Sequence, residues 1–358
     1  MTQSAPSTRI RLLILLGFVL VLLCLPRFFR IRIETSIAKG KIEYFAERFG
    51  DVARYTDHVE WLRQPSETAQ DIELYPPFVY RPLVPLLAAP LPFSARNSIN
   101  VINILALLIG LYALFRLMKK LGIPDKLNLL GCTLYVVSFP TLHYGAIGFI
   151  DGALIGYLCV ATWLIVAWRP RVFVPLLLIG PLLKESTIIL LPVLAAEMMS
   201  RGLLKRYIWR FCALVMAYGV VYLVIRATAP VDTSYIWVPS LDRLSRNVAR
   251  GRLFVSYPLT LGLPTLLLVW LLVADRMRAV KLLFRQGMSL VVGLICAYAL
   301  SAYALVAAVA DGRFPWTSYP FVIPIVMLLL FHHIQTRHPS RHAALHLSSE
   351  ATGSQTRT

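Results

Sequence analysis

Residues 172–200 read VFVPLLLIGPLLKESTIILLPVLAAEMMS, two apolar runs on either side of the charged pair Lys184 and Glu185. As one continuous helix, this stretch would place both charges near the middle of a membrane, where charge is costly. As two short helices joined at residues 184–186, it would place them at a membrane surface. Three prolines within the stretch fit short, irregular helices of this kind. The stretch therefore raises the choice between one helix and a hairpin.

Flanking charge favours the hairpin. Basic residues precede the stretch at Arg169 and follow it at Arg201. Cytoplasmic loops of membrane proteins carry an excess of Lys and Arg, so both flanks are expected on the cytoplasmic side. The stretch then crosses outward and returns, which places the tip at Lys184 and Glu185 on the extracytoplasmic side.

The composition of the whole chain is typical of a polytopic membrane protein, because 58% of the 358 residues are hydrophobic and only 15% are charged. The net charge of +18 would also suit a nucleic-acid partner. In so apolar a chain, basic cytoplasmic loops explain it better, so no nucleic acid is expected. The five cysteines lie in apolar stretches without a CxxC pair, which argues against a disulfide framework or a cysteine metal site.

The apolar runs predict an all-α polytopic membrane protein with about ten membrane-crossing helices, two of them the short hairpin. The first runs from Leu12 to Leu25 and lacks a following small-x-small cleavage motif, so a retained helix is expected. The other candidate spans are 99–117, 127–144, 150–168, 172–183, 187–199, 207–225, 253–273, 288–310 and 314–331.

These spans form one predicted integral-membrane domain, residues 1–331, with both termini cytoplasmic. Residues 27–98 are the predicted first extracytoplasmic loop, with interfacial helices, among them the Pro-rich piece at 82–93. Such a piece is too short to span a membrane. The polar tail, residues 332–358, is rich in His, Ser and Thr and is predicted to be disordered.

The first outer loop carries the best candidate chemistry, in the segment ERFGDVARYTDHVEWL (47–62). If it is helical, Asp51, Arg54, Tyr55 and His58 share one face at i, i+3, i+4 and i+7. A carboxylate held near the membrane surface by Arg and Tyr is a candidate general base. An ordinary solvated amphipathic helix would have the same spacing.

Further charges gather on the predicted outer face. Asp151 begins one span, Arg226 ends another, and Asp311 and Arg313 precede the last. Each alone is equally well explained as a helix-end or snorkelling charge. Several on the same face as Lys184 predict a polar site there.

Two basic segments on this face point to phosphate groups. Arg81 directly precedes the interfacial piece, where it is placed to meet a lipid phosphate. Arg243, Arg246 and Arg250 recur at i, i+3 and i+7 within 241–252, which predicts a basic amphipathic helix suited to anionic headgroups. A solvated charged loop explains the second pattern equally well.

The order of these features resembles a known family. An outward helix is followed by DVARY (51–55), YRPLVPLLA (80–88), the KEST tip (184–187) and a late DGRFP (311–315). This order is similar to bacterial GT-C-type membrane glycosyltransferases, in particular the polyprenyl-phosphate-sugar-dependent mannosyl- and arabinosyltransferase superfamily. The resemblance covers roughly residues 10–331 and rests on short motifs.

The resemblance implies an inverting glycosyltransferase of the bacterial inner (plasma) membrane that serves the cell envelope. It would move a sugar from a polyprenyl-phosphate donor to an extracytoplasmic glycan, lipid or protein acceptor, with membrane lipid around it. An acid of the first outer loop activates the acceptor in such enzymes, which is Asp51 here, with Asp57 as the second candidate. Family members often carry two such acids adjacent or one apart, whereas these two are six apart.

The resemblance also assigns supporting residues. The candidates for donor or substrate binding are Arg54, Tyr55, Arg81, Lys184, Glu185 and Arg313, with Asp151 and Asp311 in support. The metal requirement stays open, with Glu185 as the candidate ligand for a divalent cation, Mg²⁺ or Mn²⁺.

Other classes remain as alternatives. A transporter or flippase for a lipid-linked or small polar substrate would also be polytopic with broken helices, although no internal repeat is visible here. A polysaccharide ligase or polymerase would share the architecture but usually carries its long outer loop late in the chain. A non-catalytic membrane subunit is the third alternative.

Overall fold

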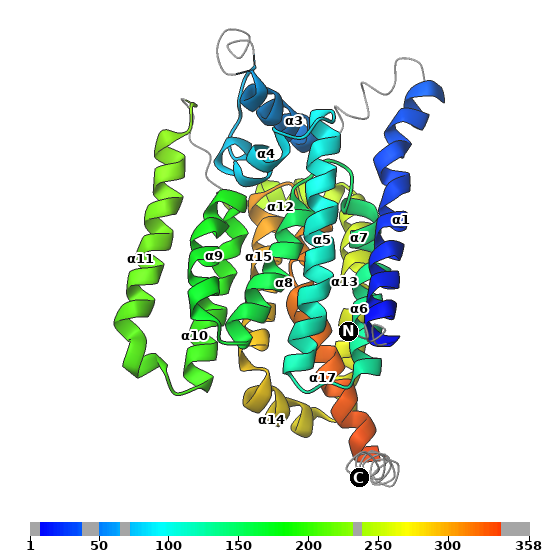
Figure 1. Cartoon of the computed structure of the whole chain (residues 1–358), viewed down its shortest axis with the longest axis vertical. Helices are drawn as coiled ribbons and strands as arrows, with labels where there is room; N and C mark the ends of the chain where they lie inside the picture. Colours follow the sequence, from blue (N-terminus) through cyan, green and yellow to red (C-terminus); the bar gives the residue numbers. More distant parts are fainter. Residues whose placement is uncertain (1–7, 38–49, 65–71, 232–237, 338–358) are drawn as a thin grey trace, which may run out of the picture.

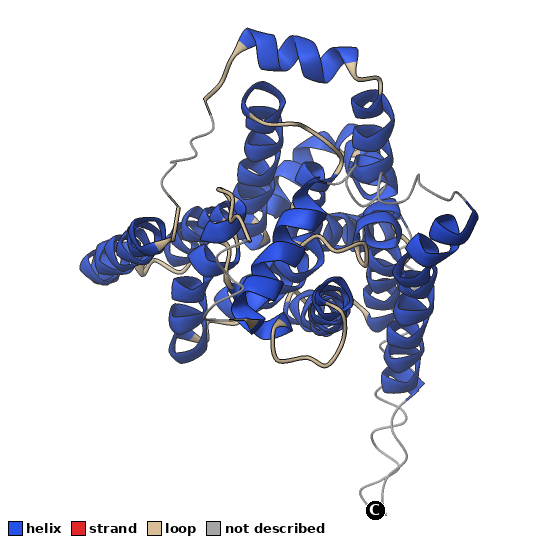
Figure 2. Ribbon diagram, turned by 90° about the horizontal axis from the view of Figure 1, so that it is seen from above, coloured by secondary structure: helices blue, strands red, loops and turns tan. Residues whose placement is uncertain are grey.

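The computed structural model describes residues 8–37, 50–64, 72–231 and 238–337, and every regular element in these ranges is helical (Figure 2). Most helices run side by side along the long axis of the molecule (Figure 1). The first helix begins, and the last ends, toward the lower end of Figure 1, whereas the short helices α3 (Gly50–Arg63) and α4 (Leu83–Ala88) lie at the upper end.

Within the described residues, five helices are long and apolar enough to cross a membrane. They are α5 (Ala95–Lys120), α11 (Leu204–Thr228), α13 (Arg252–Ala274), α15 (Met288–Ala307) and α17 (Tyr319–Arg337). Shorter apolar helices accompany them: Ile10–Leu25 within α1 (Thr8–Ile37), α8 (Asp151–Val166) and α9 (Pro170–Leu183). The chain is therefore an all-helical protein of polytopic membrane character, and ten crossings stay a prediction.

The stretch around Lys184 and Glu185 reverses direction, as the hairpin prediction requires. Helix α9 leads up to Lys184, and η3 (Glu185–Ile189) and α10 (Leu190–Ser200) lead away from it. The Lys184 side chain reaches Asp151 at the start of α8, whereas Arg201, just beyond α10, donates to the carbonyl of Val166 at the end of α8. Both arms therefore run along α8 in opposite directions.

The predicted span 127–144 is wrong as one helix. It is divided into α6 (Asp125–Val136) and α7 (Phe139–Tyr144). Pro140 has no N–H to continue the helical hydrogen bonds. The Ser138 hydroxyl donates instead to the Tyr135 carbonyl at 3.0 Å, which holds the chain at the break.

Two predicted boundaries also differ. Helix α1 continues to Ile37, so residues 27–37 are helical and not the start of the loop. Helix α17 continues to Arg337, so residues 332–337 are helical and not part of a disordered tail. In both cases, the helix extends past the apolar run that predicted it. Residues 338–358 of the predicted tail lie outside the described residues.

The remaining short helices are η2 (Phe78–Tyr80), α12 (Leu241–Ala249), α14 (Arg276–Gln286) and α16 (Arg313–Trp316). The helix predicted within 241–252 is thus present as α12. It lies at the same end of the molecule as α3, whereas α14 lies at the opposite end (Figure 1).

Close packing between α5 and α8 fixes the centre of the bundle. A Cβ atom on Gly156 would lie 2.1 Å from the Ala106 carbonyl oxygen, and one on Gly110 would lie 2.8 Å from the Gly156 Cα. Only glycine permits this approach of the two backbones. The start of α8, which carries Asp151, is thereby held at a fixed height beside α5.

Candidate active site

The first element of the site is α3, which packs onto the bundle through Val52, Tyr55 and Val59, all buried at i, i+3 and i+7. Arg63 at its end donates to the backbone carbonyls of Leu91 and Phe93 at 2.9 Å each. The three buried side chains and the Arg63 hydrogen bonds hold α3 across the end of the bundle. They therefore set the position of Asp51.

The loop before α8 approaches α3 closely. Gly148 has a φ of +99°, and a Cβ atom there would lie 2.6 Å from Val52 Cγ1. The buried Asn103 of α5 accepts a hydrogen bond from the Ala153 N–H at 2.9 Å and donates to the Phe149 carbonyl. These contacts satisfy backbone groups at the start of α8 that the helix leaves unpaired. Asp151 is therefore held in a defined place.

Asp151 connects two cations. Its Oδ1 lies 2.5 Å from Lys184 Nζ, and its Oδ2 lies 3.7 Å from an Nη atom of Arg313. The Asp151 side chain is only 3% exposed and that of Lys184 13%. A buried carboxylate of this kind requires paired cations, which the hairpin tip and the start of α16 supply.

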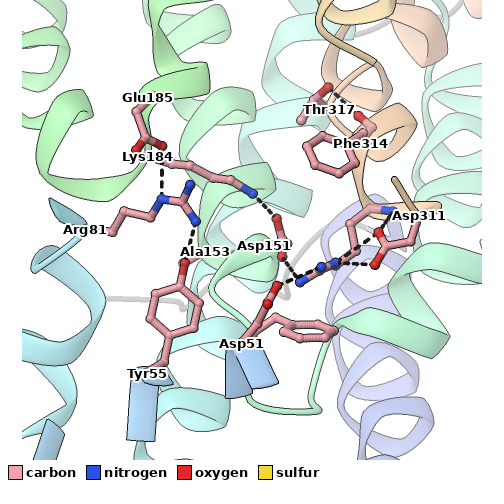
Figure 3. Close-up of polar contacts among 12 residues, drawn as sticks. Asp51, Tyr55, Arg81, Asp151, Ala153, Lys184, Glu185, Asp311, Phe314 and Thr317 are labelled. Atoms are coloured by element: carbon pink, nitrogen blue, oxygen red, sulfur yellow. Dashed lines mark hydrogen bonds and ion pairs between the residues drawn. The ribbon is translucent and has the colours of Figure 1, made fainter. Parts of the chain in front are cut away.

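Arg313 is the centre of the network, because its guanidinium pairs with Asp51, Asp151 and Asp311, three carboxylates that lie close together in Figure 3. Its Nε lies 2.9 Å from Asp311 Oδ2, and another of its nitrogens lies 2.8 Å from Asp51 Oδ2. Burial lowers the pKa of Arg313, but the carboxylates of Asp311, Asp51 and Asp151 outweigh it and hold the pKa well above its usual value. The guanidinium is therefore always charged.

A second group surrounds Glu185 beside the first (Figure 3). Arg81 donates from Nε to Glu185 at 3.0 Å and from Nη1 to the Tyr55 hydroxyl at 2.8 Å. The other Glu185 oxygen lies 3.5 Å from Arg226. The sequence predicts that Arg81 faces outward toward a lipid phosphate. In the structure Arg81 is buried, and its two hydrogen bonds connect the hairpin tip to α3.

A cavity of about 410 Å³ adjoins both groups. Its cations are Lys184, Arg226 and Arg313. Its aromatic walls are Tyr218, Tyr222, Tyr303 and Phe314. The cavity lies between η3, α11, α15 and α16, so its cations are set among mostly apolar walls. Such a cavity suits a ligand that is part anion and part hydrocarbon or sugar.

Charges in the network balance. Four cations meet four carboxylates through the ion pairs described. The cations are Arg81, Lys184, Arg226 and Arg313, and the carboxylates are Asp51, Asp151, Glu185 and Asp311. Asp51 is the most exposed of these carboxylates, at 39%. It is therefore the carboxylate of the network that is most accessible from outside the protein.

Two residues of the predicted α3 face, Arg54 and His58, lie apart from the network, as does Asp57 on the neighbouring face. The guanidinium of Arg54 stacks over Tyr75 at 3.3 Å and lies 3.9 Å from Asp57. His58 is buried, and burial lowers its pKa to about 4 although a hydrogen bond with the Phe78 backbone opposes this. The predicted face thus divides: Asp51 and Tyr55 contact the network, whereas Arg54 and His58 do not.

The residues do not form a recognisable metal site in the part of the chain that the structure describes, where no three His, Cys, Asp or Glu side chains are grouped to hold an ion. Glu185, the candidate ligand, already faces two guanidinium groups. The geometry therefore assigns Glu185 to positioning Arg81 and Arg226.

The sequence analysis includes Arg226 among the charges of this face, but it does not identify the aromatic side chains around it, Tyr80 and Tyr222. The guanidinium of Arg226 lies 4.6 Å from the Tyr80 ring centre and 4.4 Å from that of Tyr222. The spacing of Tyr222 and Arg226, four residues apart at the end of an apolar helix, is a signal that was available. The contribution of Tyr80 depends on tertiary contact and left no local signal.

Comparison with known proteins adds no relative: no family model matches this chain, and no curated protein matches it.

Proposed function

We propose that this chain is an inverting membrane glycosyltransferase of the GT-C type, which takes a sugar from a polyprenyl-phosphate donor. The observation that carries the proposal is the cavity of about 410 Å³, in which Lys184, Arg226 and Arg313 are set among aromatic and aliphatic side chains. A donor of this class combines one phosphate, one sugar and an isoprenoid chain, which is the combination of surfaces that the cavity offers.

The donor phosphate would lie against Lys184 and Arg313. Hydrogen bonds between charged donors and phosphate oxygens are strong, and Arg binds such groups through two nitrogens at once. Arg226 would be the third cation within reach of the phosphate. Tyr222 and Phe314 would contact the sugar or the first isoprene units.

Phosphate binding would also release Asp51. The network is balanced, so an added anion must replace a carboxylate on one of the cations. Asp51 is the most exposed carboxylate and lies 2.8 Å from Arg313. Replaced there by phosphate, the Asp51 carboxylate is released from the guanidinium and is free to accept the proton of the acceptor hydroxyl.

The proposed chemical step transfers the sugar from the donor phosphate to the acceptor hydroxyl. Asp51 takes the proton of the acceptor hydroxyl, and the acceptor oxygen forms a bond to the anomeric carbon on the side opposite the phosphate. The bond between the anomeric carbon and the phosphate oxygen breaks, and its electron pair leaves with polyprenyl phosphate. Lys184 and Arg313 stabilise the charge that develops on that phosphate.

The proposal includes the membrane orientation. The network end of the bundle would face the extracytoplasmic side of the inner membrane, with both termini cytoplasmic and ten crossings. The support is the Lys and Arg excess in the short loops at the other end, at Lys119, Lys120 and Lys126 and along α14.

Deleting the gene and comparing surface glycans by mass spectrometry tests the function in cells. The proposal predicts the loss of one sugar, restored by the wild-type gene but not by Asp51→Asn. Lys184→Met should also fail to restore it, because a charged partner of the donor phosphate is lost. An unchanged glycan profile, together with altered distribution of a lipid-linked sugar across the membrane, would favour the flippase alternative.

A further inference from the structure

Helix α14 lies at the end of the bundle opposite the candidate active site (Figure 1). A second cavity adjoins this helix. Ala279 and Leu283 of α14 are buried against the bundle. Met277 and Phe284 are 70% and 69% exposed, so the helix also presents apolar side chains outward. An amphipathic helix of this kind lies in the interface between a membrane and water.

The cavity, of about 320 Å³, has a strongly basic lining. Arg278, Lys281 and Arg285 of α14 face His332 and His333 of α17 across it. Its single carboxylate, Asp275, lies 3.8 Å from Arg278. Within the described part of the chain, no acid lies at ion-pair distance from Lys281 or Arg285, so two positive charges are left without a partner.

An apolar surface leads to this cavity along α13. Leu266, Val269 and Val273 are exposed by 68%, 54% and 78% on the outer side of α13, and Leu271 of the same helix lines the cavity. Trp270, half exposed, lies with its ring centre 5.4 Å from that of His333. Tryptophan at such a position is typical of headgroup depth in a membrane.

We propose that this cavity binds the headgroup of an anionic phospholipid. Lys281 and Arg285 would hold the phosphate, and an acyl chain would lie along the exposed side of α13. The basic lining explains the preference for an anion, and the adjoining apolar surface explains why the anion is a lipid and not free phosphate. The inference depends on this end of the molecule alone and not on the proposed glycosyl transfer.

The test uses the delipidated full-length protein and native mass spectrometry. The probes are phosphatidylglycerol and phosphatidylcholine with the same acyl chains, each added alone and also with inorganic phosphate. Each basic residue near an anionic membrane surface contributes about a fivefold preference. The double variant Lys281→Gln/Arg285→Gln should therefore lower the preference for phosphatidylglycerol about 30-fold.

The matched control is Lys119→Gln/Lys120→Gln, which removes the same charge from exposed residues at the end of α5. This control should keep the wild-type preference, and melting temperatures should show that both variants are folded. An equal loss in the control would assign the effect to general surface charge and overturn the site. Equal binding of the two lipids by the wild-type protein, or displacement of the lipid by millimolar phosphate, would also overturn it.

Discussion

Arg313 and Asp51 form an ion pair with a nitrogen-to-oxygen distance of 2.8 Å, which joins the short helix α16 to α3. The same guanidinium also contacts Asp311 and Asp151. This one side chain therefore connects α3, the start of α8 and the segment before α17, and Asp151 extends the connection to Lys184 of the hairpin. Removing a member of this network should have effects on stability as well as on chemistry, and the two must be measured separately.

The first prediction concerns the contribution of the buried ion pair between Asp151 and Lys184 to stability. Asp151→Asn leaves Lys184 without its carboxylate at a site where both side chains are nearly inaccessible. Loss of one partner of a buried pair typically destabilises by about 3–5 kcal/mol. Thermal unfolding in detergent should show a large fall in melting temperature. Asp242→Asn, which removes the exposed partner of Arg246, is the control and should change little.

The second prediction concerns the hydrogen bond between Tyr55 and Arg81 in the group around Glu185. Tyr55→Phe removes the hydroxyl that accepts a hydrogen bond from the buried Arg81, which should cost about 1–3 kcal/mol of stability. Tyr112→Phe is a close control, because its hydroxyl also accepts from an arginine, Arg116, but at an exposed position. Equal melting temperatures for the two variants would contradict the role given to Arg81.

His58 predicts a pH dependence of stability. Burial lowers its pKa in the folded protein to about 4 from 6.5 in the unfolded chain. The folded state therefore binds this proton less readily, so its contribution is complete above pH 6.5 and is lost as the pH falls toward 4. The loss amounts to about 3 kcal/mol. His58→Leu should remove this component from the fall in melting temperature between pH 6.5 and 4, and an identical pH profile would refute it.

Membrane orientation is predicted from labelling of intact cells. In a variant without the five native cysteines, Asp242→Cys on α12 should react with an impermeant thiol reagent, and Lys205→Cys beyond α10 should react only after permeabilisation. Both positions are exposed in the structure, so accessibility does not separate them. The reverse pattern would invert the proposed orientation.

Much of the architecture was predictable because apolar length and loop charge are local properties. Most of the predicted apolar helices are present with shifted ends, and the reversal at Lys184 was predicted from the basic residues on both flanks of the stretch. The break at Ser138 was missed, although Pro140 marks it. Helix ends at Ile37 and Arg337 were missed because helical hydrogen bonds do not stop where the apolar run stops.

The site was predictable only as a set of residues on one face. Helical spacing placed Asp51, Arg54 and Tyr55 together on α3, but it does not show which part of the protein that face contacts. In the structure, Tyr55 points to the buried Arg81, whereas Arg54 stacks on Tyr75. Asn103 left no signal because a lone Asn in an apolar helix has several ordinary explanations. The contacts of these side chains depend on partners that are distant in the sequence. Local sequence patterns therefore do not predict them.

The most direct test supplies synthetic polyprenyl-phosphate sugars and a cell-envelope acceptor extract to the purified full-length protein, and measures the polyprenyl phosphate released. The wild-type protein should turn over one such donor. Asp51→Asn should lower the rate about 10²–10⁴-fold, the usual contribution of a general base, with donor binding and folding retained. Asp57→Asn should stay near wild type, because Asp57 faces Arg54 away from the network. Loss of turnover in Asp57→Asn alone would move the base to that residue, and full turnover in both variants would contradict the proposed chemistry of this loop.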